Sequence, residues 1–120
     1  MLYLSRSCRY FYYNGIADMR KGAYSLSGLV RNQMNRDVLS GDVFIFIGRR
    51  GNKIKLLQWD SDGFALYEKG LERGSFERPS VINEAGHYSI SAQQLGYILQ
   101  GVVLKSIQHR KRFFLSATAV

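Results

Sequence analysis

The sequence predicts an α+β fold in which a mostly antiparallel β-sheet, built around a hairpin and meander, packs against two main helices. Residues 43–68 alternate apolar and polar side chains with a period of two, which is typical of strands. Residues 21–34 and 91–102 place apolar side chains three and four positions apart, which is typical of amphipathic helices. The 120 residues contain no internal repeat or linker, so we expect a single domain over residues 1–120.

The N-terminal third predicts one strand and one helix. Residues 8–13 are aromatic and β-prone, and the turn signal Asn14-Gly15 follows them. The helix runs from Lys21 to about Met34, with Arg31 in its last turns, where a cation suits the helix dipole. Its apolar stripe consists of Ala23, Leu26, Leu29, Val30 and Met34.

Residues 43–48 and 53–59 predict a hairpin with a two-residue turn at Gly51-Asn52. In that register Arg50 lies opposite Lys53, and Gly48 lies opposite Lys55. One face then resembles core and carries Val43, Ile45, Ile47, Ile54 and Leu56. The other face carries Phe44, Phe46, Leu57 and Trp59, with the cations Arg50, Lys53 and Lys55 at its tip.

The C-terminal half begins with a turn at residues 60–63, where Gly63 is free to take a left-handed conformation. Residues 64–69 predict a third antiparallel strand. The second helix covers residues 91–102, and Ser91 and Gln94 have the spacing of a capping box. Residues 102–120 form a basic C-terminal tail whose end we expect to be frayed.

The charge balance suits a polyanionic partner. Lysine and arginine total 17 against 9 acidic residues, for a net charge of +8. The alternative is a soluble protein that is merely basic.

No apolar run is long enough for a signal peptide or a membrane span, so we expect a cytoplasmic protein without a membrane partner. The single cysteine, Cys8, excludes an intramolecular disulfide, and we expect a buried, inert thiol.

Catalytic signatures are weak. Asp60 and Asp62 resemble a carboxylate pair that could hold Mg²⁺ in a nuclease, but no spacing singles out a third acid, and Asp and Gly are ordinary turn residues. His87 and His109 lie 22 positions apart with no cysteine nearby, so no zinc spacing exists. We therefore predict no catalytic residue, metal ligand or cofactor.

The basic hairpin is the stronger signal. In the predicted register Arg50 and Lys53 are cross-strand neighbours, and like charges there destabilise a sheet by roughly 0.2–1 kcal/mol. A bound polyanion would relieve this repulsion, and the aromatic face beside it could stack on bases. The alternative is that the aromatic side chains form a second half-core beneath solvated cations. Arg20 and Lys21 add a second basic patch at the start of a helix, where cations do not serve stability.

Four blocks occur in one order: DMRKG (18–22), GRRGNKIKLLQWDSDGF (48–64), KGLERGSF (69–76) followed by Pro79, and SAQQLGYILQG (91–101). Together they resemble the small accessory protein, often called TnpB, that is encoded by the second reading frame of the insertion sequences of family sixty-six. The resemblance covers roughly residues 8–101. It implies a bacterial mobile element whose separate transposase performs strand transfer, and it implies no catalytic residue.

These observations favour a non-enzymatic accessory protein of transposition that binds DNA at element ends or in a transposition complex. One alternative is an interaction module whose aromatic face docks on the transposase or another element-encoded protein. Another is a metal-dependent nuclease that uses Asp60 and Asp62. For the favoured function, Trp59 is expected to pack or stack, and the predicted phosphate contacts are Arg20, Lys21, Arg49, Arg50, Lys53, Lys55 and Arg73.

Overall fold

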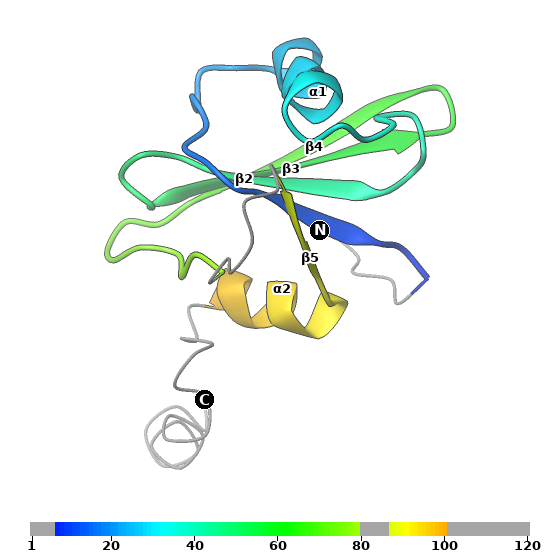
Figure 1. Cartoon of the computed structure of the whole chain (residues 1–120). Helices are drawn as coiled ribbons and strands as arrows, with labels where there is room; N and C mark the ends of the chain where they lie inside the picture. The colour runs from blue at the N-terminus through cyan, green and yellow to red at the C-terminus, as the bar shows by residue number, and fades with distance from the viewer. Residues whose placement is uncertain (1–6, 80–86, 101–120) are drawn as a thin grey trace.

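The computed structural model describes residues 7–79 and 87–100 (Figure 1). Five strands form one sheet in the order β4-β3-β2-β1-β5, and β1–β2 is its parallel pair while the other neighbours are antiparallel. The predicted α+β fold is therefore confirmed. In chain order the elements are β1 (Tyr10–Tyr13), α1 (Ala23–Asn32), β2 (Val43–Ile47), β3 (Lys53–Asp60), β4 (Gly63–Gly70), β5 (His87–Ile90) and α2 (Ala92–Gln100).

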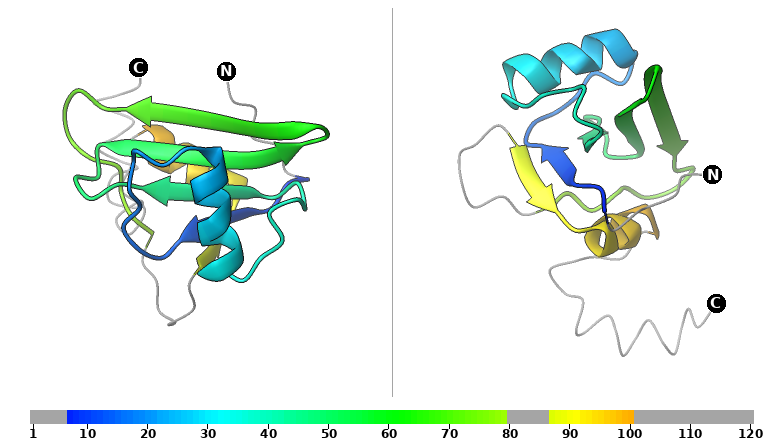
Figure 2. Two further views of the ribbon diagram at one scale, coloured as in Figure 1. Left: turned by 90° about the horizontal axis from the view of Figure 1, so that it is seen from above. Right: turned by 90° about the vertical axis from the view of Figure 1, so that its right-hand side faces the viewer.

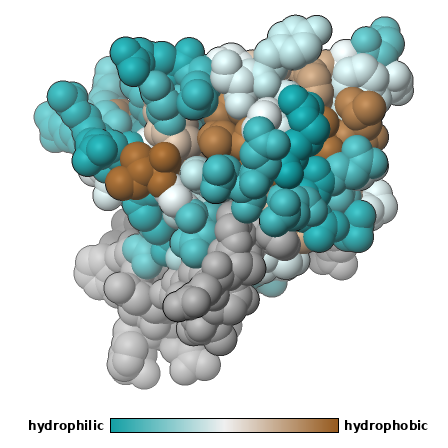
Figure 3. All heavy atoms as spheres, turned by 45° about the horizontal axis from the view of Figure 1, so that its top comes forward, coloured by the Kyte–Doolittle hydropathy of each residue, from teal (hydrophilic) through white to brown (hydrophobic). Residues whose placement is uncertain are grey.

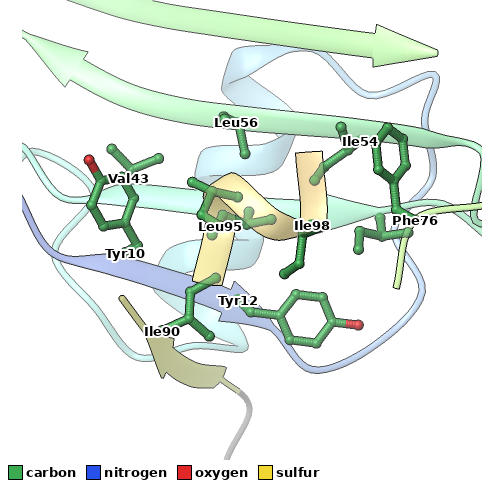
Figure 4. Close-up of a cluster of buried hydrophobic side chains, with 11 residues drawn as sticks. Tyr10, Tyr12, Val43, Ile54, Leu56, Phe76, Ile90, Leu95 and Ile98 are labelled. Carbon is green, nitrogen blue, oxygen red and sulfur yellow. The ribbon is translucent and has the colours of Figure 1, made fainter. Parts of the chain in front are cut away.

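The two helices cover opposite faces of the sheet, with α1 on one side and α2 on the other (Figures 1 and 2). The sheet therefore has two cores. The core on the α2 side includes the predicted apolar face of the hairpin and adds Leu95 and Ile98 from the helix (Figure 4). The core on the α1 side is formed by Phe11, Ala17, Leu26, Val30, Met34, Val38, Phe44, Phe46 and Leu57.

The second core corrects one functional expectation. Phe44 and Phe46 are both 0% exposed beneath α1, so neither ring is available to stack on a base. The period-two pattern assigned them correctly to one face. A second amphipathic element, α1, covers that face because its own apolar stripe needs a partner.

The predicted hairpin register is wrong by two residues. Phe46 pairs with Lys55 and Ile47 with Ile54, and the Gly48 N–H donates to the Lys53 carbonyl at 3.1 Å. The connection therefore contains four residues, 49–52, in place of the two-residue turn at Gly51-Asn52. A shift of two preserves which side chains share a face, so the face assignment holds. The predicted repulsion between Arg50 and Lys53 across the strands has no basis in this register.

The turn between β3 and β4 differs in its details from the prediction. Asp60 pairs with Gly63, so the predicted third antiparallel strand is present, but Ser61 is the residue with positive φ, at 60°. Gly63 does not have a positive φ.

Both predicted helices are present. Helix α1 is two residues shorter than predicted at each end, and α2 begins one residue later than predicted, while residues 101 and 102 lie outside the described residues. The capping box of α2 is confirmed, because Ser91 Oγ accepts from the Gln94 N–H at 3.0 Å and Gln94 Oε1 accepts from the Ser91 N–H at 2.8 Å. Helix α1 begins after Gly22, which provides no side-chain cap. The basic tail at 102–120 and His109 lie outside the described residues. Among the residues that the structure describes, no helix is long and apolar enough to cross a membrane.

Candidate nucleic-acid interface

A cleft lies between residues 16–20, which precede α1, and the connection between β2 and β3. Four predicted phosphate contacts line it, namely Arg20, Arg49, Arg50 and Lys53, and we call this feature the basic cleft. Arg20 is 33 positions before Lys53 in the sequence, so the fold, and not chain proximity, gathers these charges. Figure 3 shows the α1 side of the molecule as a largely hydrophilic surface interrupted by a few hydrophobic patches.

The two walls of the basic cleft are joined through the backbone. Ala17 forms a parallel β-bridge with Gly48, and the Ala17 N–H donates to the Ile47 carbonyl at 3.2 Å. This bridge continues the parallel pairing of β1 with β2. Gly48 also packs closely against Met19, because a Cβ added at Gly48 would lie 2.5 Å from the Met19 Cγ. A larger residue at position 48 would therefore force the Met19 side chain to move.

A second segment, residues 71–78, lies along the connection between β2 and β3, and we call it the strap. The Leu71 N–H donates to the Asn52 carbonyl at 2.8 Å, and the Phe76 N–H donates to the Gly51 carbonyl at 2.7 Å. Arg78 donates from its guanidinium to the carbonyls of Ile47, Gly48 and Arg49. Figure 1 shows that both loops lie at the same end of the sheet. The sequence prediction did not include Arg78.

One acid lies in the basic cleft. Asp18 accepts from Arg20 Nε at 3.0 Å and from Arg20 Nη2 at 2.9 Å, and the Arg20 backbone N–H donates to the same carboxylate. These bonds, with the side-chain bond from Arg20 the largest cause, lower the pKa of Asp18 from 3.8 to about 2. Asp18 is therefore charged at neutral pH and neutralises part of the Arg20 charge. The Arg20 side chain still remains 91% exposed.

The remaining cations of the cleft have no acidic partner among the described residues. Arg49, Arg50 and Lys53 are exposed, and no carboxylate within residues 7–79 and 87–100 forms a salt bridge with any of them. The positive potential at the turn is thus uncompensated locally. Such a surface attracts an anionic ligand.

Lys55 does not belong to this surface. Its side chain is only 7% exposed, and its Nζ donates to the Lys21 carbonyl at 2.8 Å and lies 3.7 Å from Glu68 Oε1. The ammonium therefore connects β3 to the start of α1 and to β4. Lys21 itself is half-buried and lies outside the lining of the basic cleft.

Trp59 lies at the far end of β3 from the cleft. It lies six positions after Lys53, which is about 20 Å at the ~3.3 Å rise of a strand. Its ring contacts Phe64 edge-on at 5.1 Å between centroids, and Phe64 contacts Tyr24 at 6.4 Å. The structure therefore does not bring Trp59 together with the predicted phosphate contacts.

Arg73 is exposed on the strap, and Gly74 beside it has a φ of 77°, so the chain turns sharply there. Its neighbours Leu71 and Phe76 donate to the turn that carries Arg49 and Arg50. Arg73 is therefore near the basic cleft in the fold, although it does not line it.

Asp60 and Asp62 are exposed at the turn between β3 and β4. In the part of the chain that the structure describes, no group of three His, Cys, Asp or Glu side chains is positioned to hold a metal ion. Two turn carboxylates alone offer few of the six or more oxygen ligands that hard divalent cations take.

Comparison with known proteins identifies the family. A protein of Sinorhizobium fredii (strain NBRC 101917 / NGR234), described as uncharacterized protein y4hO, is 37% identical over 102 residues, which is 85% of this chain and 87% of that protein. A second protein of that strain, uncharacterized protein y4jC, is 34% identical over 85 residues, which is 71% of this chain and 73% of that protein. No solved structure matches the chain. The sequence model described as IS66 Orf2 like protein matches residues 8–109, and the chain therefore belongs to this family of insertion-sequence accessory proteins, which is not a known enzyme family.

Proposed function

We propose that this accessory protein acts without catalysis and binds DNA through the basic cleft, at element ends or within a transposition complex. The observation that carries the proposal is the convergence of Arg20, Arg49, Arg50 and Lys53 on one cleft. Three of these four cations have no carboxylate partner among the described residues. Stability alone gives no reason to gather unpaired cations from two distant segments.

The proposed contacts are to phosphates. Guanidinium groups donate two parallel hydrogen bonds to a phosphate, and the Lys53 ammonium acts as a point charge. Such contacts position a protein on DNA without reading its sequence. Lys21 and Arg73 flank the proposed contact surface, whereas Lys55 is engaged inside the fold and Trp59 lies at the other end of β3.

Fluorescence anisotropy with labelled duplexes tests the proposal over a range of salt concentrations. Each phosphate contact releases counterions and contributes about −0.9 to the log–log salt slope. Contacts from the three cations without a carboxylate partner, Arg49, Arg50 and Lys53, therefore contribute about −2.7, three times 0.9, to the slope on element-end and unrelated DNA alike. Absence of binding at low salt, with or without the transposase, would contradict the proposal.

A second candidate function is docking on the transposase through an aromatic surface. Tyr24 is 86% exposed, and its ring meets Phe64, which in turn meets Trp59. Exposed aromatic side chains are typical of energetically important protein contacts. This surface is formed by α1, β3 and β4 and lies apart from the cations of the turn.

The two functions separate experimentally. A Tyr24→Ala variant should lose binding to purified transposase if the aromatic surface docks, and it should bind DNA normally. An Arg49→Ala/Arg50→Ala variant should show the reverse pattern. If that double variant binds DNA normally but loses the transposase, the cations meet an acidic protein surface and the DNA-binding proposal is wrong.

A further inference from the structure

The connection between β2 and β3 is held in an unusual way for an exposed hairpin loop. The carbonyls of residues 47, 48, 49, 51 and 52 all accept hydrogen bonds from the strap. The loop also carries its own bond, from the Gly51 N–H to the Gly48 carbonyl at 3.0 Å. Its backbone is therefore held by the strap, while the side chains of Arg49 and Arg50 remain exposed.

Arg78 makes the most contacts in this arrangement. Its guanidinium reaches three carbonyls, those of Ile47, Gly48 and Arg49, which lie 29 to 31 positions earlier in the chain. A planar guanidinium presents five donors in a fixed geometry, whereas a lysine ammonium presents three donors on a flexible stem. No carboxylate in the described part of the chain forms a salt bridge with Arg78, and within those residues its guanidinium donates to carbonyls of the loop.

Close packing of Gly51 against the strap also holds the β2–β3 connection in place. Gly51 has a φ of 75°, and a Cβ added there would lie 3.1 Å from the Ser75 Cβ and 3.8 Å from Arg78 Nη2. The loop and the strap therefore touch directly over Gly51. A glycine at this position allows both the left-handed backbone and the close approach.

We propose that Arg78 is a positioning residue that orders the β2–β3 connection before DNA binds, so that Arg49 and Arg50 are presented to phosphates without an ordering cost. The inference rests on the proposed function, because it assigns a role within the same surface. A loop that is ordered only on binding loses affinity through the conformational entropy of its backbone. Arg78 itself contacts carbonyls and makes no phosphate contact.

The test uses Arg78→Lys and Arg78→Gln in the full chain, with Arg31→Lys and Arg31→Gln as matched controls. Arg31 is exposed in the last turn of α1, and its guanidinium makes one 3.4 Å contact, with Ser27 Oγ. Both Arg78 variants should bind DNA about tenfold more weakly, equivalent to ~1.4 kcal/mol. The salt slope of Arg78→Lys should match the wild-type slope, because no phosphate contact is lost.

Amide hydrogen exchange in the free protein supplies a readout that does not depend on DNA. The Gly51 amide should exchange faster in both Arg78 variants, while the amide of Ile45 in β2 should exchange at the wild-type rate. A uniform acceleration across the sheet would mean that Arg78 only stabilises the whole fold, and it would overturn the positioning role.

The outcomes distinguish the inference from the function on which it rests. If Arg78→Lys binds DNA within twofold of wild type while Arg49→Ala/Arg50→Ala flattens the salt slope, the positioning role is wrong and DNA binding stands. If Arg78→Gln flattens the slope and Arg78→Lys restores it, Arg78 is a phosphate contact and not a positioning residue. If the wild-type protein does not bind DNA, the proposed function fails, and the exchange rate of Gly51 alone decides whether Arg78 orders the loop.

Discussion

Lys53 and Lys55 lie on the same strand and the same face of the sheet, but mutation of Lys53 should weaken DNA binding whereas mutation of Lys55 should lower stability. Lys53 is exposed in the basic cleft, whereas Lys55 is nearly buried and donates to the Lys21 carbonyl at 2.8 Å. Lys55→Ala removes a charged hydrogen-bond donor and the apolar stem beside it. Lys53→Ala removes a solvated charge.

The structure sets the expected magnitudes. A hydrogen bond from a charged group contributes about 1.5–3 kcal/mol, so Lys55→Ala should lower the free energy of unfolding by roughly that amount. The contact with Glu68 adds little, because that side chain is 48% exposed and the two atoms lie 3.7 Å apart. Lys53→Ala should change stability by less than about 0.5 kcal/mol.

Urea melts and salt-dependent DNA binding measure the two effects separately. Lys53→Ala should make the salt slope less negative by about 0.9, and Lys55→Ala should leave the slope unchanged at protein concentrations where it is folded. The reasoning would be refuted if Lys55→Ala were as stable as wild type and flattened the slope. That result would mean that Lys55 turns outward to contact DNA.

Three further predictions concern other parts of the molecule. Asp18→Asn should release Arg20 and strengthen DNA binding. The same substitution should lower stability at neutral pH, because the folded pKa of Asp18 is depressed to about 2. Acid titration of unfolding should show that the stability advantage of wild type over this variant is present above about pH 4 and is lost as the pH falls through 2. Leu56→Ala should cost about 2–5 kcal/mol in denaturant melts by leaving a cavity, whereas the exposed Asp62→Ala should cost far less, and the reverse order would contradict the assignment of Leu56 to the core. Titration calorimetry should detect no tight Mg²⁺ or Mn²⁺ binding at Asp60 and Asp62, and micromolar binding that Asp60→Ala abolishes would favour a nuclease.

Local patterns in the sequence were sufficient to predict the hairpin faces and both helices. Alternation with a period of two places Ile54 and Leu56 on one face and Leu57 on the other, whatever the exact register. The observed four-residue connection is hydrogen-bonded to the strap, whose Arg78 lies about thirty positions beyond the turn that it contacts. Strand β5 was not predicted because its four residues carry too short a pattern. The turn signal at Gly51-Asn52 is local and carries no information about the distant contacts of Arg78, so the predicted two-residue turn is wrong.

The candidate site was predictable in its charges but not in its geometry. Clustered cations at 49, 50 and 53 are visible in the sequence, whereas their meeting with Arg20 depends on the bridge between Ala17 and Gly48. The burial of Lys55 follows from a long-range backbone acceptor that no spacing reveals. Its one local signal is the charge of Glu68, which pairs with it across β3 and β4.

The salt dependence of DNA binding by the Arg49→Ala/Arg50→Ala variant tests the central claim most directly. Arg31→Glu is the matched control, because it also lowers the net charge of +8 by two units but lies in the last turn of α1. The double variant should make the salt slope less negative by about 1.8, twice 0.9, equally on element-end and unrelated DNA. Arg31→Glu should keep the wild-type slope within about 0.5, which is well below one contact. Equal flattening by the two variants would show that binding follows net charge alone and would contradict a DNA interface at the basic cleft.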